Sequence, residues 1–440
     1  MNNLMYPTKK ITLSLITIFL LTFGLQSCSA DSKINTTVDS TFGSYQILMR
    51  TFMEESNIRG ASVALFDNQK TLWSEGFGWL NSDEKQRVNT QTIFSIQSMS
   101  KTFTATAVML AVQEGLLDLD KPITVYLPDF RINSCFEKDP EKKITLRLLL
   151  GCTAGFTHDA PIGNSFNASF SSYEEHYRSI SDTWLKSPVG TQYFYSNLGF
   201  DLAAYIIEKI SGMTFSEYLE RKIFQPLSMY STTVDAKRIL EIQNRAEGSI
   251  FGLKKLPAIV PMIGAGGIYS NAEDLIKFVQ FHLNYGSYGG QQMLRKEHVV
   301  EMYKPIHIDS YALGIRIVDE GVTYAFNHNG GGFGFRSSMK WFPEHNIGVI
   351  ILTNCLYSNG IYETASTILD DYIKRGLAKK DTLSDKFNPI KYFKETKESK
   401  KIQISASTVS QCAGDSVYRP SWDKYTGTYL VKMSGGFEFT

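Results

Sequence analysis

Ser98 and Lys101 stand three residues apart at the start of residues 98–114, a stretch that is apolar or small almost all round. Residues three apart share one face of a helix, so the lysine amine can reach the serine hydroxyl. A helix without a polar face is buried, and a lysine among apolar neighbours has a lowered pKa and can act as a base when neutral. The pair predicts a serine nucleophile activated by lysine, although a capping serine beside a solvated lysine also fits these four residues.

Tyr195 and Asn197 form a second polar pair, just before a predicted helix at residues 198–210. In an extended segment residues two apart point the same way, so the phenol and the carboxamide face one side together. One group can shuttle a proton while the other positions a substrate amide. The alternative is a tyrosine packed between layers and an asparagine that caps the helix.

A third polar segment, His328-Asn329-Gly330-Gly331-Gly332, leads into a predicted strand at residues 333–342. Glycines let a substrate approach the backbone closely, and a backbone N–H at this place can point at an oxyanion. A glycine-rich turn with a solvated histidine is the alternative.

The elements that must position these residues follow from hydrophobic periodicity. Residues 44–53 predict a short helix, residues 61–66 and 71–77 a hairpin, and residues 123–245 mainly helices, such as 198–210 and 214–223. Strand patterns return at residues 311–318, 322–326, 333–342 and 347–353, before a final helix at residues 362–375. We therefore expect an α/β (α+β) fold, in which an antiparallel β-sheet built from both chain ends is flanked by helices and an all-helical lobe is inserted at about residues 123–245.

The N-terminus predicts export. Lys9 and Lys10 precede an apolar run at residues 11–25, and Cys28 follows shortly after it. This order of positive charge, apolar run and small residue is typical of a signal peptide, and the run is short for a membrane span, which needs about 20 residues. Leu25-Gln26-Ser27-Cys28 resembles a bacterial lipoprotein signal, which implies lipidation of Cys28. A plain secretory signal with an incidental Cys28 is the alternative.

Composition and residue spacing argue against a nucleic-acid-binding protein, a metal site and a disulfide framework. The chain of 440 residues has 45 basic and 44 acidic residues, so nothing indicates nucleic-acid binding. Its seven histidines are dispersed without metal-ligand spacing, and we predict no metal and no cofactor. After Cys28 the cysteines are too scattered for a disulfide framework, so we expect buried free thiols; they are Cys135, Cys152, Cys355 and Cys412.

Together and in this order, Ser98-x-x-Lys101, Tyr195-x-Asn197 and His328-x-Gly330 resemble the serine β-lactamase and penicillin-binding-protein superfamily. The likeness is to the branch with class C β-lactamases, D-stereospecific peptidases and related esterases. It covers about residues 44–375, including residues 60–79, 92–130, 193–229 and 264–278. The resemblance implies a β-lactamase/transpeptidase-like fold.

The resemblance also implies an acyl-enzyme mechanism. Ser98 attacks a carbonyl, and Lys101 and Tyr195 pass its proton to the leaving group. Asn197 orients the substrate, and the oxyanion lies between the backbone N–H groups of Ser98 and Gly331. Water then releases the acyl group, and no motif names the residue that activates this water.

Two departures from the family pattern affect the expected substrate. His328 replaces the lysine of many relatives, and its ordinary pKa of about 6.5 predicts a substrate anchor that is charged only below neutral pH. This favours a peptidase or esterase over an efficient β-lactamase. Gly151 and Cys152 replace a serine and a histidine in the segment that supports the wall of the active site.

The resulting domain plan is a lipoprotein-type signal at 1–27, a tether at 28–43, a catalytic domain at 44–375, a linker at 376–410 and a partial C-terminal β segment at 411–440. We expect a lipid-anchored protein of the bacterial envelope, facing the periplasm or the cell surface. Its substrate is a D-amino-acid amide of cell-wall type, an ester or a β-lactam, and a penicillin- or peptidoglycan-binding lipoprotein with little turnover is the alternative.

Overall fold

The computed structural model describes residues 40–165, 167–250, 256–306, 311–320 and 324–378. By its contacts the chain divides into residues 1–43 and 44–440, and the second unit holds the sheet and the site described below. The predicted signal peptide, Cys28 and the C-terminal segment 411–440 lie outside the described residues, as do residues 28–39 of the tether and 379–410 of the linker. Helix α1 (Ser40–Glu55) begins within the predicted tether.

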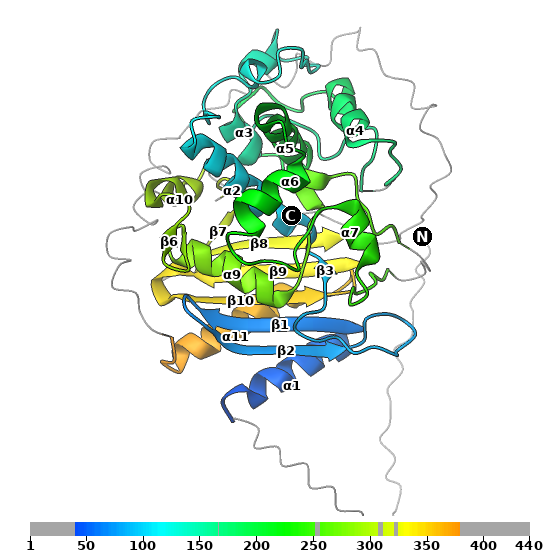
Figure 1. The fold of residues 1–440 in the computed structure, drawn as a ribbon, viewed down its shortest axis with the longest axis vertical. Coiled ribbons are helices and arrows are strands. Elements are labelled where there is room, and N and C mark those ends of the chain that lie inside the picture. The colour runs from blue at the N-terminus through cyan, green and yellow to red at the C-terminus, as the bar shows by residue number, and fades with distance from the viewer. Residues whose placement is uncertain (1–39, 166, 251–255, 307–310, 321–323, 379–440) are drawn as a thin grey trace, which may run out of the picture. The chain divides into compact units, whose positions relative to one another are not determined.

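A six-stranded antiparallel sheet forms the centre of the second unit, in the order β2-β1-β10-β9-β8-β7 (Figure 1). Strands from the beginning and the end of the second unit's described residues pair in this sheet, where Val63 of β1 lies opposite Ile351 of β10. Every residue of β10 is buried, which explains its continuous apolar sequence. The strands are β1 (Gly60–Asp67), β2 (Thr71–Gly78), β7 (Arg316–Asp319), β8 (Tyr324–Gly332), β9 (Phe335–Phe342) and β10 (Ile347–Thr353).

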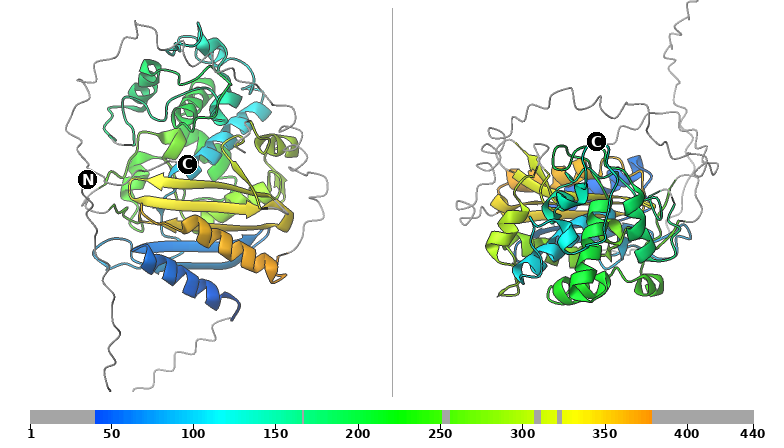
Figure 2. Two further views of the ribbon diagram at one scale, coloured as in Figure 1. Left: turned by 180° about the vertical axis from the view of Figure 1, so that it is seen from behind. Right: turned by 90° about the horizontal axis from the view of Figure 1, so that it is seen from above.

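Helices cover both faces of this sheet. Helix α9 (Ala272–Leu283) lies on one face, and α11 (Ile361–Lys374) lies with α1 on the other (Figure 2). The mixed fold of helices and an antiparallel sheet, predicted from the sequence, is confirmed.

The helical part of the unit lies beyond the β7 edge of the sheet (Figure 1). Helix α2 (Ser100–Gln113) runs through it, and every residue from Ser100 to Ala111 is buried, as its sequence predicts. The other helices are α3 (Leu146–Leu150), α4 (Tyr173–Ser179), α5 (Leu198–Ser211), α6 (Phe215–Leu219), α7 (Ala236–Glu241), α8 (Ile263–Gly266) and α10 (Lys296–Met302). Short strands β3 (Phe94–Ser95), β4 (Tyr269–Ser270), β5 (Ser287–Tyr288) and β6 (Gln291–Gln292) make two small sheets, and a π-helical turn, Glu220–Phe224, continues α6.

The predicted strand at residues 311–318 begins only at Arg316. The chain turns before it, where Ala312 N donates to Ile315 O at 2.8 Å and Gly314 has φ +65°. A Cβ on Gly314 would lie 2.7 Å from the carbonyl oxygen of Lys101. A glycine is therefore needed where this turn packs against α2.

Two of the expected free thiols are confirmed, because Cys152 and Cys355 are buried and unpaired. The prediction is wrong for Cys135, which is disulfide-bonded, since distance along the chain does not limit distance in space. Cys412 lies outside the described residues.

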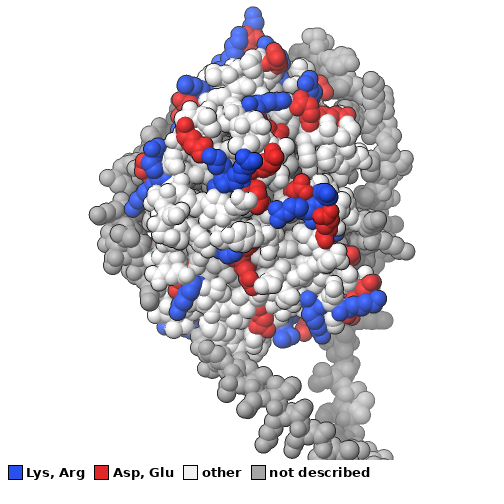
Figure 3. All heavy atoms as spheres, in the orientation of Figure 1, with Lys and Arg blue, Asp and Glu red and all other residues white. Residues whose placement is uncertain are grey.

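Acidic and basic side chains intermix on the face shown in Figure 3, in keeping with the near-neutral composition. Among the described residues no group of three or more His, Cys, Asp or Glu could hold a metal ion. In the same part of the chain, no helix has both the length and the apolar character that crossing a bilayer requires.

Candidate active site

Ser98 lies in a 3-10 turn, Gln97–Met99, that leads directly into α2. Gln97 has φ +49°, a strained backbone that is typical of functional sites. Lys101, one turn further on, is fully buried, and its Nζ lies 3.0 Å from Ser98 Oγ. The structure thus brings the two residues together and excludes a solvated lysine.

The Lys101 amine is surrounded by three oxygen atoms. Besides Ser98 Oγ, its Nζ contacts Asn197 Oδ1 at 2.7 Å and the Ala265 carbonyl at 3.0 Å. The latter two atoms can only accept hydrogen bonds, so they take the two N–H groups of a neutral amine and leave its lone pair facing Ser98. Burial lowers the pKa of Lys101 to about 8, although the charges of the Asp201 and Asp159 carboxylates act to raise it. A useful fraction of Lys101 is therefore neutral near physiological pH.

Asn197 is held from its other end by Asp159. Asn197 Nδ2 donates to Asp159 Oδ1 at 2.7 Å, which fixes the amide so that Oδ1 faces Lys101. Its side chain does not cap α5, so the capping alternative is wrong. Asp159 was missed in the sequence. Burial works to raise its pKa, but hydrogen bonds from His158 and Asn197 lower it overall, so Asp159 is a carboxylate.

Tyr195 completes the group around Ser98. Its side chain interacts with Ser98, and the centre of its ring is 4.8 Å from Lys101 Nζ. Burial raises the pKa of Tyr195 well above its ordinary value, although the interaction with Ser98 opposes this. Tyr195 therefore carries its proton and can donate it to a leaving group.

His328 is buried on β8, and its predicted charge switch near pH 6.5 is wrong. Its Nδ1 lies 2.9 Å from the Asn329 carbonyl and its Nε2 lies 3.0 Å from the Tyr311 hydroxyl. The carbonyl can only accept, so Nδ1 carries the proton and Nε2 accepts from Tyr311. Burial, followed by the charge of Lys101, lowers the pKa of His328 to about 3. A solvated histidine is excluded as well.

Gly330 and Gly331 are strand residues and not part of a turn. They lie opposite Ser337 and Arg336 of β9. A Cβ on Gly330 would lie 2.2 Å from the Ile96 carbonyl oxygen, so only glycine lets β8 pack against the turn that carries Ser98. A Cβ on Gly331 would have its nearest neighbour at 3.9 Å, which leaves space for a bound molecule.

Arg316 on β7 is a second residue that sequence reasoning missed. Its guanidinium is 6.0 Å from the Tyr195 ring centre and 5.6 Å from that of Tyr311, and Nη2 lies 3.5 Å from Tyr193 Oη. No carboxylate among the described residues pairs with Arg316. The sequence feature that could have revealed Arg316 is its position as a cation within the apolar segment 311–318.

The segment with Gly151 and Cys152 keeps its supporting role despite the unusual residues. Phe194 N donates to the Cys152 carbonyl at 2.9 Å, which ties the segment to the chain just before Tyr195. Burial raises the pKa of the Cys152 thiol to about 11, so the thiol is protonated and is not a nucleophile. A Cβ on Gly151 would lie 2.8 Å from Ile306, which explains the glycine.

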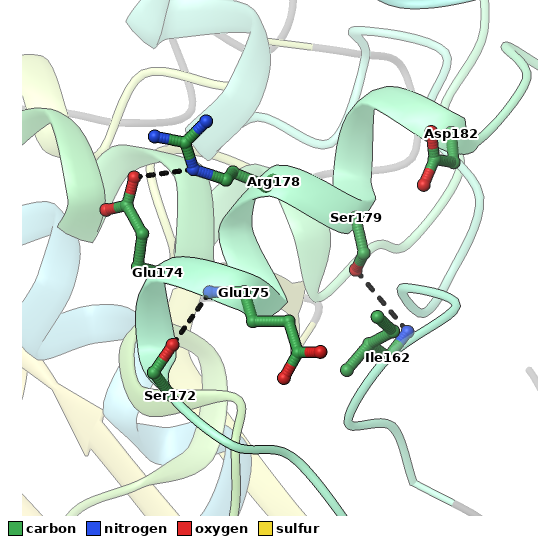
Figure 4. A pocket seen from close by; sticks show the side chains of 7 residues that line it. All are labelled: Ile162, Ser172, Glu174, Glu175, Arg178, Ser179 and Asp182. Carbon is green, nitrogen blue, oxygen red and sulfur yellow. Dashed lines mark hydrogen bonds and ion pairs between the residues drawn. The ribbon is translucent and has the colours of Figure 1, made fainter.

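A separate surface hollow of about 440 Å³ lies beside α4 (Figure 4). Its lining contains none of the residues predicted from the motifs; it consists of Ile162, Ser172, Glu174, Glu175, Arg178, Ser179 and Asp182.

Comparisons with known proteins show the family of this chain. A family model described as Beta-lactamase matches residues 46–372. The D-alanyl-D-alanine-carboxypeptidase/endopeptidase AmpH of Escherichia coli is 25% identical over 316 residues, which are 68% of this chain and 80% of AmpH. Protein flp of Staphylococcus aureus is 22% identical over 347 residues, 73% of this chain and 67% of flp. In other strains the match covers about 60% of flp, so the chain spans roughly two thirds of this relative or less.

Solved structures share the fold. An octameric penicillin-binding protein homologue from Pyrococcus abyssi superimposes with a TM-score of 0.66 at 23% identity, covering 76% of this chain and 77% of that one. A β-lactamase/D-alanine carboxypeptidase from Pseudomonas syringae gives a TM-score of 0.63 at 22% identity, covering 74% and 97%. Since the family model spans residues 46–372, the chain belongs to the Beta-lactamase family, within the serine β-lactamase and penicillin-binding-protein-like superfamily of serine hydrolases.

Proposed function

We propose that this chain hydrolyses a small molecule or peptide through an acyl-enzyme on Ser98. The observation that carries the proposal is the fully buried Lys101, whose Nζ lies 3.0 Å from Ser98 Oγ and is held by two further acceptors. A desolvated lysine with a lowered pKa is the activated base that a serine nucleophile needs.

Acylation then proceeds in balanced steps. Ser98 Oγ attacks the substrate carbonyl and gives its proton to Lys101, and the bond to the leaving group breaks as Tyr195 donates its proton to that group. Lys101 returns the proton to Tyr195. The backbone N–H groups of Ser98 and Gly331 are the proposed donors to the oxyanion, and water later releases the acyl group from Ser98.

The proposed substrate carries an anionic group on its leaving side, as a peptide of cell-wall type with a terminal carboxylate does. Arg316 supports this choice, because its guanidinium lies 6.0 Å from the Tyr195 ring centre and has no acidic partner among the described residues. His328, which is neutral, takes no part in binding this charge. The relative AmpH, a D-alanyl-D-alanine carboxypeptidase and endopeptidase, is in keeping with such a substrate.

The proposed location is the bacterial envelope, with residues 1–27 removed and a lipid on Cys28. The order of charges, apolar residues and Cys28 at the N-terminus supports this proposal, and the disulfide at Cys135 is typical of oxidising compartments. Labelling cells with a tagged fatty acid should mark the full-length protein and leave Cys28→Ala unmarked. Equal labelling of the two would refute lipidation at Cys28.

Hydrolysis of a p-nitrophenyl ester by residues 29–440 tests the proposed nucleophile. Ser98→Ala should lose activity by at least on the order of 10³-fold. The control is Ser100→Ala, a buried neighbour whose Oγ accepts from Ile268 N at 3.2 Å, which should keep its turnover at some cost in stability. Full activity in Ser98→Ala would overturn the proposal, and a burst of product without further turnover would indicate a binding protein.

A further inference from the structure

A buried chain of hydrogen bonds runs from α4 to Lys101. His176 on α4 places Nδ1 2.7 Å from the Ile162 carbonyl and Nε2 3.2 Å from Asp201 Oδ2. Asp201 Oδ1 accepts from the backbone N–H groups of Gly264 and Ala265, each at 3.0 Å. The carbonyl of Ala265 then accepts from Lys101 Nζ at 3.0 Å. Asp201 is therefore connected to Lys101, the proposed base, through one residue, Ala265.

Asp201 fixes the short helix α8 on α5. The N–H groups at the start of a helix have no partner within it, and the carboxylate of Asp201 supplies one for two of them. The contact is close, because a Cβ on Gly264 would lie 2.4 Å from the Phe200 carbonyl oxygen. This arrangement holds the Ala265 carbonyl toward Lys101.

The same carboxylate is a fixed charge near the base. His176 and Asp201 are both fully buried. Burial alone would lower the pKa of His176, but the hydrogen bond and the charge of Asp201 raise it above its ordinary value. Asp201 is also the leading charge that raises the pKa of Lys101 against the effect of burial. The other titratable groups around Lys101 are Cys152, Asp159, Tyr195 and His328.

We propose that the buried His176–Asp201 pair is a positioning element for the acylation step. It orients Lys101 through the Ala265 carbonyl and holds the negative charge that sets the balance between protonated and neutral Lys101. The outer end of the chain is Ile162, which lines the hollow beside α4 and whose N–H donates to Ser179 at 3.4 Å (Figure 4). This inference rests on the proposed serine hydrolase function.

Asp201→Asn separates the two roles. The amide oxygen can still accept from Gly264 and Ala265, and the amide nitrogen can donate to His176 Nε2 once that nitrogen has lost its proton. Helix α8 thus keeps its support while the negative charge of Asp201 is lost, together with the positive charge of His176. Removal of the negative charge makes Lys101 easier to deprotonate. The acid limb of kcat/KM for the p-nitrophenyl ester, which reports the essential base of the free enzyme, should move to lower pH by roughly 0.5 unit or more.

Further variants make the direction of the shift testable. Asp201→Glu keeps the charge and should keep the acid limb at its original pH, even if turnover falls. His176→Gln leaves the Asp201 charge without its cationic partner and should move the limb to higher pH, which gives a test that does not depend on Asp201→Asn folding.

The matched control is Asp274→Asn on α9. Asp274 is a buried carboxylate that accepts from Ser231 N and Thr232 Oγ1, each at 2.9 Å, and it is absent from the charges that act on Lys101. Asp274→Asn should lower the stability of the protein without moving the acid limb of the kcat/KM profile. This inference alone would be overturned if Asp201→Asn and His176→Gln both fold and the acid limb of their kcat/KM profiles does not move. Full activity in Ser98→Ala would instead overturn the proposed serine hydrolase function on which the inference rests.

Discussion

Two buried histidines, His328 on the sheet and His176 on α4, have opposite protonation. Both nitrogens of His176 face oxygen atoms that only accept, the Ile162 carbonyl and the Asp201 carboxylate, so the ring is a cation. His328 faces one carbonyl and one hydroxyl, and the hydroxyl can donate, so the ring is neutral. Both residues are buried, and their hydrogen-bond partners decide the charge.

The difference extends to the two sides of the candidate site. On the sheet side, Arg316 of β7 stands beside the neutral His328, and its positive charge helps to lower the pKa of that histidine. On the helical side, Asp159 and Asp201 are carboxylates that raise the pKa of Lys101. Lys101 lies between a cationic and an anionic side, and each side can be altered separately.

The largest expected effect is on the rate of acylation, and it follows from replacing Lys101, which lies between the two sides of the site. Lys101→Met keeps the volume of the side chain but removes the base, so acylation by the ester should slow on the order of 10³-fold. Stopped-flow release of p-nitrophenol measures this rate. The matched control is Lys340→Met, a buried lysine on β9 that contacts Glu320 at 2.6 Å and Ser366 at 2.8 Å, for which acylation should stay near the original rate. Equal losses in the two variants would contradict the role of Lys101.

A smaller effect is expected from the cationic side. Arg316→Gln should raise KM for an N-acyl-D-alanyl-D-alanine peptide roughly 10- to 100-fold, because a charge-assisted hydrogen bond contributes about 1.5–3 kcal/mol. The same peptide with an amidated C-terminus should show little change. Arg245→Gln, which removes another arginine that lies over a tyrosine ring, is the control. A similar rise in KM for both peptides would contradict the proposed anchor.

The smallest effect concerns His328 and appears in stability. Its pKa is about 3 in the folded protein and about 6.5 when unfolded, so the unfolded chain binds more protons between these values. The free energy of unfolding that comes from keeping His328 neutral is therefore fully present above pH 6.5 and is lost as the pH falls. Between pH 7 and pH 5 the native sequence should therefore lose about 2 kcal/mol more unfolding free energy than His328→Gln.

Urea unfolding at the two pH values measures this difference. Equal losses in both proteins would show that His328 is not held neutral. The pH profile of kcat/KM between pH 6 and pH 8 should also be unchanged in His328→Gln, because a neutral ring is replaced by a neutral amide.

The sequence predicted those parts of the site that depend on local spacing. Ser98 and Lys101 are one helical turn apart, and the apolar residues that follow predicted the burial of Lys101. Asp159 and Arg316 were missed, because each reaches the site from a segment that carries none of the three motifs. Asp201 was missed although it lies one helical turn after Asn197, because no local pattern reveals its contacts with His176 and α8. The charge of His328 was predicted wrongly for the same reason, since its pKa depends on burial against Lys101 and on the contact with Tyr311. The strand at residues 311–318 was predicted too long, because apolar periodicity does not reveal the turn at Gly314.

The most direct test of the account is mass spectrometry of the protein after brief incubation with a p-nitrophenyl ester and, separately, with a penicillin, followed by mapping of the modified peptide. A single acyl group should form on Ser98 from the ester, slowly in Lys101→Met and not at all in Ser98→Ala. An acyl group on any other residue, or the same adduct in Ser98→Ala, would contradict the role of Ser98 as the nucleophile.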